Sequence, residues 1–387
     1  MAAEPAAGRV ATPPVRRGLV PRWTVRALAG VHSVPRAAWD ALARRGFHRY
    51  RWFEAAEACG WRARHVAILD RGELRAVIPA YLHGDQAHAD PHRRALDPLT
   101  RAARRAGVDL RPALVVGPPL AGVSDPVGEM RAVPPDALEA ALGLLELLAA
   151  ADGARAVVWP ALGAEAAAIV TAARRRGYTA AASGSTARLE VGWRDLDAYV
   201  ASQGERAGRA IRADLAALNA AGIRTEAAHD WRHAADAAAQ VCRESCRRGG
   251  GREPRLLPDL FAELAALPTP GVWAQLTWRG ARLVGFTLNL EADGVVDAAF
   301  AAAADVPERA AISAQQLVYH QIAAGVAAGY RRLELGPRSL SWKRLRGGSL
   351  HPRVTLIRGA TRPLRAVLHA LSLGVNWRSA WIERRLG

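Results

Sequence analysis

Apolar residues recur along the chain with the two periods that are typical of helices and strands. Short runs rich in Val, Leu and Ile predict strands, and longer stretches with apolar residues three and four apart predict helices. Near the start, helices are expected at 35–45 and 48–61, and strands at 64–70 and 73–82. The residues 70–72 (Asp-Arg-Gly) join these strands and are typical of a hairpin turn.

The rest of the first half predicts alternating strands and helices. Residues 84–109 are polar and without periodicity, so a loop or mobile insertion is expected there. After it, strands are expected at 112–122, 156–162 and 187–191, and helices between them at 135–153 and 164–178.

The second half repeats this order of elements. It predicts a helical region at 195–222 and a strand at 223–228, followed by a helix through Arg243. A flexible segment is expected at 246–255, a helix at 257–267 and a group of strands at 272–303. A helix at 312–330 and a last strand at 331–336 follow. Helices, a hairpin, a helix and a strand therefore occur twice, which argues for an internal duplication. The sequence predicts an α/β protein of two mixed-sheet domains, 23–190 and 191–360, with helices on both faces.

The two ends of the chain differ from the body. Residues 1–22 are rich in Pro, Ala and Arg and are expected to be disordered. Residues 361–387 predict a basic helix with apolar residues at helical spacing, followed by Trp377 and Trp381. Two interpretations are open: the helix packs on the body with its basic side in solvent, or it lies on a membrane or nucleic acid.

Composition limits the class of protein. The 387 residues suit two domains, and 50% of them are apolar, many being Ala. No segment approaches the roughly 20 apolar residues that span a bilayer, and the first twenty residues do not resemble a signal peptide. The cytoplasm is therefore the expected compartment. Three cysteines are too few for a disulfide framework, and Cys242 and Cys246 have no nearby partners for a metal, so no metal is expected.

The net charge of +17 predicts contact with a polyanion. Among 53 basic residues, Lys343 is the single lysine. An ammonium kept at one position suggests that a guanidinium would not serve there.

Three groups of residues are candidates for chemistry. Lys343 follows a strand that ends at Gly336 and a turn that begins at Pro337, and it precedes Gly347 and Gly348. Strand ends that open into glycine-rich loops often hold sites in α/β proteins. An ammonium there would hold a phosphate or stabilise the oxyanion of an acyl-transfer intermediate; the alternative is an ordinary solvated loop.

The second group is a set of arginines at intervals of three, which share one helical face and suit phosphates, although such a stripe is also typical of a solvated surface. They are Arg206, Arg209 and Arg212. The third group is Tyr319 and His320 on a helix, which are candidates for proton handling; the alternative for His320 is a structural histidine. Glu334 is expected to act as a base or to orient Lys343 or Arg338.

Several segments resemble the two-domain Fem-type peptidyltransferases and their GNAT relatives. The segment 64–82 is similar to the hairpin that opens many of them, and 207–223 to their arginine-bearing helix. The segments 281–302 and 313–348 resemble their second acyltransferase core, where a helix and a strand lead to a Gly, a short loop and a Lys. The match covers most of 22–357. No coiled-coil arm of the kind found in the cell-wall members is evident.

The resemblance implies tandem GNAT-like folds and transfer of an acyl group to an amine. It implies an aminoacyl-tRNA donor, with Lys343 at the place of the lysine that stabilises the oxyanion. It also implies that Arg209 and Arg212 lie where the family carries charged residues that bind the acceptor or a phosphate. Arg206 and Arg338 are further candidates for contacts with phosphate or carboxylate. Without the coiled-coil arm, the expected acceptor is a small molecule, as in peptide-modifying branches of secondary metabolism.

Two other hypotheses remain. Acetyl-CoA enzymes of the GNAT type bind the pyrophosphate with a [RQ]-x-x-G-x-[GA] loop at a helix N-terminus. Neither half has a strict match, and the nearest segment, 282–287, is predicted to be a strand. This favours aminoacyl-tRNA, with no bound cofactor, over acetyl-CoA or another acyl-CoA. The alternatives are an acyl-CoA-dependent N-acyltransferase and a non-catalytic protein that binds nucleic acid or a membrane surface.

Overall fold

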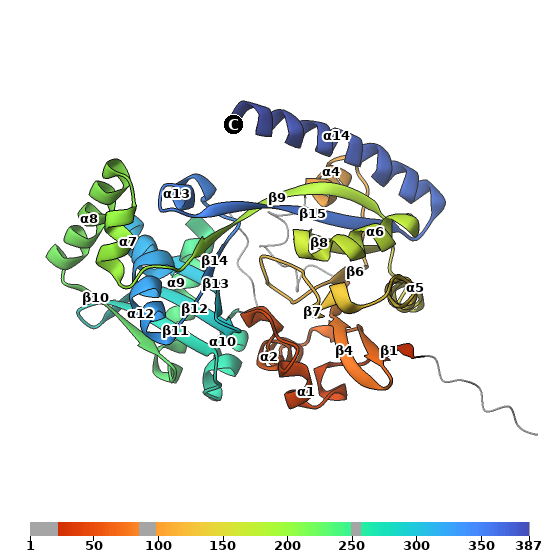
Figure 1. The fold of residues 1–387 in the computed structure, drawn as a ribbon, viewed down its shortest axis with the longest axis horizontal. Coiled ribbons are helices and arrows are strands. Elements are labelled where there is room, and N and C mark those ends of the chain that lie inside the picture. The colour runs from red at the N-terminus through yellow and green to blue at the C-terminus, as the bar shows by residue number, and fades with distance from the viewer. Residues whose placement is uncertain (1–21, 85–97, 249–256, 387) are drawn as a thin grey trace, which may run out of the picture.

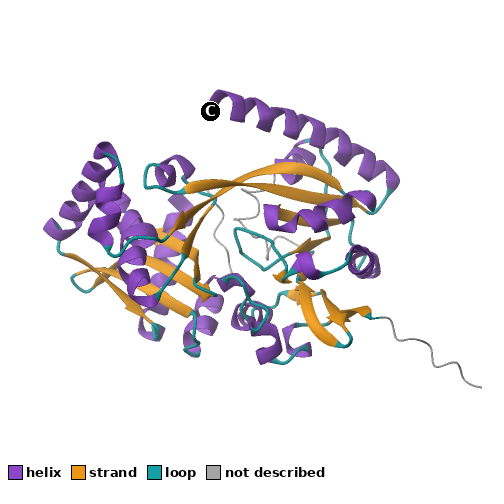
Figure 2. Ribbon diagram, in the orientation of Figure 1, coloured by secondary structure: helices purple, strands orange, loops and turns teal. Residues whose placement is uncertain are grey.

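The computed structural model describes residues 22–84, 98–248 and 257–386, with side chains omitted for residues 257 and 378–386. Most of the predicted disordered segment 1–22 and of the flexible segment 246–255 lies outside these ranges. The described chain forms a mixed α/β structure (Figures 1 and 2).

The strands form two sheets, one in the order β1-β3-β4-β7 and a larger one in the order β10-β11-β12-β13-β14-β9-β15-β8-β6-β5-β2. Their bounds are β1 (Trp23–Leu28), β2 (Arg62–Ala63), β3 (His65–Asp70), β4 (Glu73–Ile78), β5 (Ala80–His83), β6 (Ala113–Val116), β7 (Val127–Gly128), β8 (Ala156–Leu162), β9 (Thr179–Glu190), β10 (Ile223–Ala228), β11 (Val272–Arg279), β12 (Arg282–Ala292), β13 (Val295–Ala303), β14 (Arg332–Gly336) and β15 (Ser349–Gly359).

The helices are α1 (Arg36–Asp40), α2 (Tyr50–Ala58), α4 (Pro98–Arg105), α5 (Pro135–Ala151), α6 (Ala167–Arg175), α7 (Leu196–Ser202), α8 (Glu205–Ala220), α9 (Ala235–Arg248), α10 (Leu257–Ala266), α11 (Arg309–Ala314), α12 (His320–Ala328), α13 (Leu340–Arg344) and α14 (Arg362–Leu386). A π-helical turn over Gln315–Tyr319 joins α11 to α12. Short 3₁₀ turns lie at Val31–Ser33, Gly46–His48, Met130–Ala132, Ala164–Ala166 and Arg232–Ala234.

Each half contains one parallel pair of strands among antiparallel neighbours. In the first half β6 runs parallel to β8, and in the second half β13 runs parallel to β14. Helices cover both faces of the second half: α7, α8 and α12 pack on one face, and α2, α9 and α10 on the other. In the first half α5 and α6 lie on one face and α4 and α14 on the other. The predicted mixed-sheet α/β architecture with helices on both faces is therefore confirmed.

Two long strands connect the halves. β9 pairs along its length with β15, and β15 also pairs with β8 while β9 pairs with β14. The large sheet thus runs through both halves of the molecule (Figure 1). β9 ends at Glu190, and the division of the chain into two domains after this residue stays a prediction.

Three local predictions were wrong. The expected loop at 84–109 contains α4, whose few apolar residues, Leu99 and Ala103, are buried in the cluster that also contains Leu368 of α14. The expected helix over 195–222 is interrupted at Gln203-Gly204 between α7 and α8. The strand expected at 187–191 begins at Thr179, because its Ala, Ser and Gly residues have low strand propensity and are held by pairing with β15.

The C-terminal helix packs on the body, as one of the two interpretations predicted. Leu368 is buried, and α14 lies against β9 and α4 (Figure 1). Leu373 and Trp377 are exposed. In the described part of the chain, no helix combines the length and hydropathy that crossing a bilayer requires.

Candidate functional site

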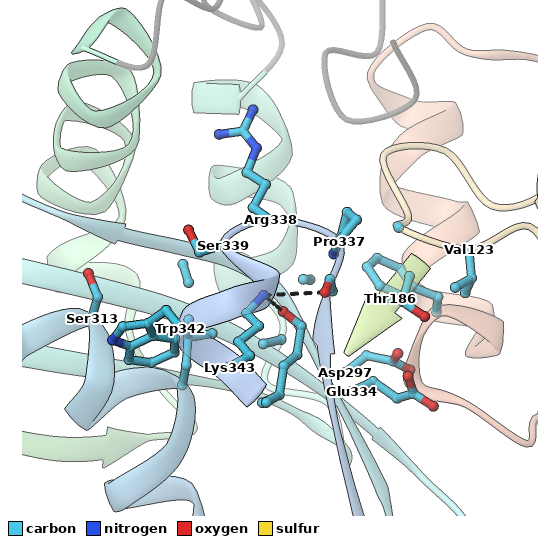
Figure 3. Close-up of a pocket in the computed structure, with 18 of the residues that line it drawn as sticks. Val123, Thr186, Asp297, Ser313, Glu334, Pro337, Arg338, Ser339, Trp342 and Lys343 are labelled. Atoms are coloured by element: carbon cyan, nitrogen blue, oxygen red, sulfur yellow. Dashed lines mark hydrogen bonds between the residues drawn. The ribbon is translucent and has the colours of Figure 1, made fainter. Parts of the chain in front are cut away.

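The candidate site begins where the parallel strands β13 and β14 separate. They pair at only three positions, which end with Asp297 opposite Glu334. Beyond this point the strands leave a cavity of about 420 Å³. Its walls include β13, β14, the residues up to Lys343, helices α9 and α11, and first-half loops. The residues that line it include Arg45, Val123, Thr186, Asp297, Ser313, Glu334, Pro337, Arg338, Trp342 and Lys343 (Figure 3).

Lys343 is buried in the wall of this cavity. Its Nζ donates hydrogen bonds to the carbonyl oxygens of Leu335 and Gly336, the latter at 3.3 Å (Figure 3). These carbonyls belong to the end of β14, so the ammonium is fixed at the opening between the strands. Burial, with a smaller contribution from the positive charge of Arg338, lowers the pKa of Lys343 to about 7.

The backbone around Lys343 is tightly constrained. The loop before it contains Gly336 with φ 76° and Ser339 with φ 54°, a left-handed conformation that is costly for a residue with a Cβ. After it, the Gly348 N–H donates to the Lys343 carbonyl at 3.0 Å. A Cβ at position 348 would lie 2.9 Å from that same oxygen, so a glycine is required for this approach.

A second wall of the cavity carries buried charges. Arg45 pairs with Asp297 at 2.5 Å and with Glu334 at 3.4 Å, and Arg188 pairs with Glu334 at 2.8 Å. Burial raises the pKa of Glu334, although Arg45 opposes this, and the neighbouring Asp297 raises it further. A buried carboxylate with a raised pKa is a candidate for accepting or donating a proton. Figure 3 shows Asp297 and Glu334 on the side of the cavity away from Trp342 and Ser313.

The structure brings Lys343, Glu334 and Arg338 to one cavity. Arg338 is exposed, and its guanidinium points away from Lys343 (Figure 3). Glu334 also lies 3.4 Å from Arg332, so its carboxylate pairs with arginines of both halves. The charged wall and Lys343 line the same cavity. The hydrogen-bond partners of the Lys343 ammonium are carbonyl oxygens, and within the described residues no carboxylate pairs with it.

The other predicted residues do not line this cavity. Tyr319 is buried, and its hydroxyl donates to Asp214 at 2.7 Å. His320 is partly buried with its Nδ1 3.0 Å from the amide nitrogen of Gln275, and burial lowers its pKa. The three arginines of α8 are exposed, and one of them forms a surface ion pair with a glutamate one turn earlier. They are Arg206, Arg209 and Arg212, with Arg209 3.4 Å from Glu205.

Sequence reasoning missed Asp297 and Arg45. A signal for Asp297 was present, because a charged residue within an otherwise apolar strand segment is rarely buried without a partner. Arg45 carries no comparable signal: it lies far from Asp297 in sequence, among other arginines, and only the fold brings the two together.

The equivalent opening in the first half is filled. β6 and β8 pair in parallel at three positions, and the loop after β6 then folds back over β8. The Trp159 indole donates to the carbonyl of Ser124 at 2.7 Å, and both residues are buried. Gly117 allows this packing, since a Cβ there would lie 2.4 Å from the Cβ of Ser124. In the part of the chain that the structure describes, the corresponding separation of β13 and β14 in the second half opens into the cavity.

Two mixed α/β units, each with a separating pair of parallel strands and joined in one sheet, define a tandem GNAT-like fold. Solved structures agree. FemX superimposes with a TM-score of 0.59 at 12% sequence identity, over 87% of this chain and 98% of that one. This confirms the fold that the Fem-type resemblance predicted.

Two further structures are similar. A conserved protein of unknown function from Bacteroides thetaiotaomicron matches with a TM-score of 0.53 and 12% identity, over 87% of this chain and all of that one. L-PGS from Bacillus licheniformis matches with a TM-score of 0.50 and 14% identity, over 78% and 86%. No protein-family model matches the sequence, and no curated protein matches it significantly.

Proposed function

We propose that this protein is an acyltransferase of the Fem/GNAT type that moves an aminoacyl group from aminoacyl-tRNA to the amine of a small acceptor. The observation that carries the proposal is the single lysine, buried and fixed at the opening of a cavity within this fold. Such an ammonium is placed to stabilise negative charge on an oxygen in a site that excludes water.

The reaction assigns a defined task to Lys343. The neutral amine of the acceptor attacks the carbonyl carbon of the aminoacyl ester and forms a C–N bond. The carbonyl oxygen then carries a negative charge, which the Lys343 ammonium stabilises. Collapse of this intermediate breaks the C–O bond to the ribose, and the proton lost by the nitrogen balances the one taken up by the ribose oxygen. The raised pKa of Glu334 suits it to handle that proton.

The region that follows the cavity-lining strand favours an ester of tRNA over acyl-CoA. α11 is the next helix after β13, and the connection between them carries Asp305 and Glu308. Glu308 pairs with Arg279, and Asp305 lies 3.4 Å from Arg248. A pyrophosphate bound at this helix N-terminus would meet two carboxylates, which opposes its binding. The charge of +17 and the exposed arginines of α8 support an RNA partner.

The test is to incubate the purified protein with a pool of labelled aminoacyl-tRNAs and candidate amines, and in parallel with labelled acetyl-CoA. We expect label to move from tRNA to an amine. Lys343→Ala should abolish this transfer, and the exposed neighbour variant Arg344→Ala should retain it. Transfer from acetyl-CoA alone would refute aminoacyl-tRNA as the donor. An active Lys343→Ala variant would refute the proposed role of the lysine. RNA binding without any transfer would refute the proposal that the protein is an enzyme.

A further inference from the structure

A buried polar cluster lies next to the lysine but outside the cavity. Arg346 donates from Nε to the Tyr319 hydroxyl at 3.0 Å and from its terminal nitrogen to Asp214 at 2.6 Å. The Tyr319 hydroxyl donates to the same carboxylate oxygen of Asp214 at 2.7 Å. Arg346 and Tyr319 are buried, and the Asp214 side chain is largely covered. The three groups therefore satisfy one another in a closed triangle.

This cluster holds the segment that carries Lys343. The Arg346 N–H donates to the carbonyl of Lys343 at 3.1 Å, and the Arg346 carbonyl accepts a hydrogen bond from Tyr199 at 3.0 Å. The guanidinium also stacks on Trp342, 4.2 Å from the ring centre, and Trp342 lines the cavity. Arg346 thus contacts both residues that the segment presents to the cavity.

The partners of Arg346 come from three separate elements. Asp214 lies on α8, Tyr199 on α7, and Tyr319 at the end of the π-helical turn. A five-residue helix such as α13 has little stability of its own. Its position therefore depends on contacts such as these, and a shift of about 1 Å at a catalytic group is enough to lower a rate about a hundredfold.

We propose that Asp214, Tyr319 and Arg346 are positioning residues that hold Lys343 at the cavity opening. The inference deepens the proposed function, because it explains how the oxyanion-stabilising group is kept in place. It gives Tyr319 a role different from the proton transfer expected from the sequence.

The single lysine allows a direct test that does not depend on activity. Protein labelled with ¹³C,¹⁵N-lysine yields one lysine side-chain signal, that of Lys343. In the wild type we expect this signal to titrate with a midpoint near 7. In Tyr319→Phe and Arg346→Gln the side chain gains access to solvent, so the midpoint should rise towards the ordinary value for lysine. Tyr330→Phe, which removes a hydroxyl bonded to Glu291 in the same unit, is the control and should not change it.

Kinetics provide the second measurement. Tyr319→Phe should lower kcat by about 10- to 100-fold with KM little changed, whereas the control Tyr330→Phe should leave both unchanged. A lysine titration in Tyr319→Phe identical to the wild type would overturn the proposal, as would an unchanged kcat in this variant. Tyr319→Phe keeps the Arg346–Asp214 ion pair and is expected to fold. Its titration therefore tests the positioning role even if Arg346→Gln does not fold. If no acyl transfer is found, the titration still tests the positioning role by itself.

Discussion

Replacing Lys343 with Met should make the protein more stable while removing its activity. The folded protein holds this side chain in a buried wall with a pKa of about 7, whereas the unfolded chain has the ordinary lysine value of 10.5. Between these values the unfolded state binds a proton that the folded state has released. The destabilising contribution of Lys343 therefore decreases as the pH rises from 7 to 10.5.

The size of the effect follows from these two pKa values. At pH 7 the proton linkage costs the folded wild type about 4 kcal/mol, and at pH 10 about 1 kcal/mol. Met has a similar unbranched shape and no charge, so the variant avoids this cost. The variant also loses the hydrogen bonds to two carbonyl groups, and this loss reduces the gain in stability by roughly 1–2 kcal/mol. A net gain of about 2–3 kcal/mol at pH 7 remains, and it should vanish by pH 10.

Urea unfolding of the wild type and Lys343→Met at pH 7 and pH 10 measures this difference. Other groups titrate equally in both proteins, so the change in the difference reports Lys343 alone. Arg344→Met, at an exposed position, is the matched control and should change stability little at either pH. A variant that is less stable than the wild type at pH 7, or a difference that is the same at both pH values, would refute the reasoning.

Three further outcomes are expected. Gly348→Ala should lower activity at least tenfold, because the new methyl group displaces the Lys343 carbonyl. The control Gly192→Ala, where the methyl group enters open space, should not lower activity. Equal activities of the two variants would contradict the role of the contact between Gly348 and Lys343. Trp159→Phe should cost about 1–3 kcal/mol in urea unfolding, since the buried Ser124 carbonyl loses its donor, with activity per folded molecule unchanged. Changing the three exposed α8 arginines to Gln should weaken tRNA binding. The slope of log binding constant against log salt concentration should become shallower by about 2 to 3. An unchanged slope would show that the RNA binds elsewhere on the protein.

The regular elements of the fold were predictable where periodicity is strong. The hairpin of β3 and β4, the long helix α5 and the strands β11 to β13 have clear patterns and lie close to the expected positions. β1 and β15 were missed. The β15 sequence contains His351, Pro352 and Arg353, which are not typical of a strand, and only its neighbours on both sides hold it in place.

The candidate site was predictable in part. Lys343 stood out because it is the single lysine and follows a strand end, and the structure places it in the cavity wall. Its pairing with backbone carbonyls and the charged wall formed by Arg45 and Asp297 depend on contacts between segments far apart in sequence. No local pattern encodes such contacts. The cavity itself arises from strands that separate, a property of pairing geometry rather than of composition.

The position of β15 has a consequence for how the chain is made. This strand, which begins at Ser349, is synthesised near the end, yet it lies between β8, which ends at Leu162, and β9, which ends at Glu190. Until β15 arrives, two long strand edges lack their neighbour, and unpaired edges readily bind other chains. A polypeptide ending after residue 190 should therefore associate or require a chaperone, and a supplied 349–359 peptide should suppress that association by completing the sheet.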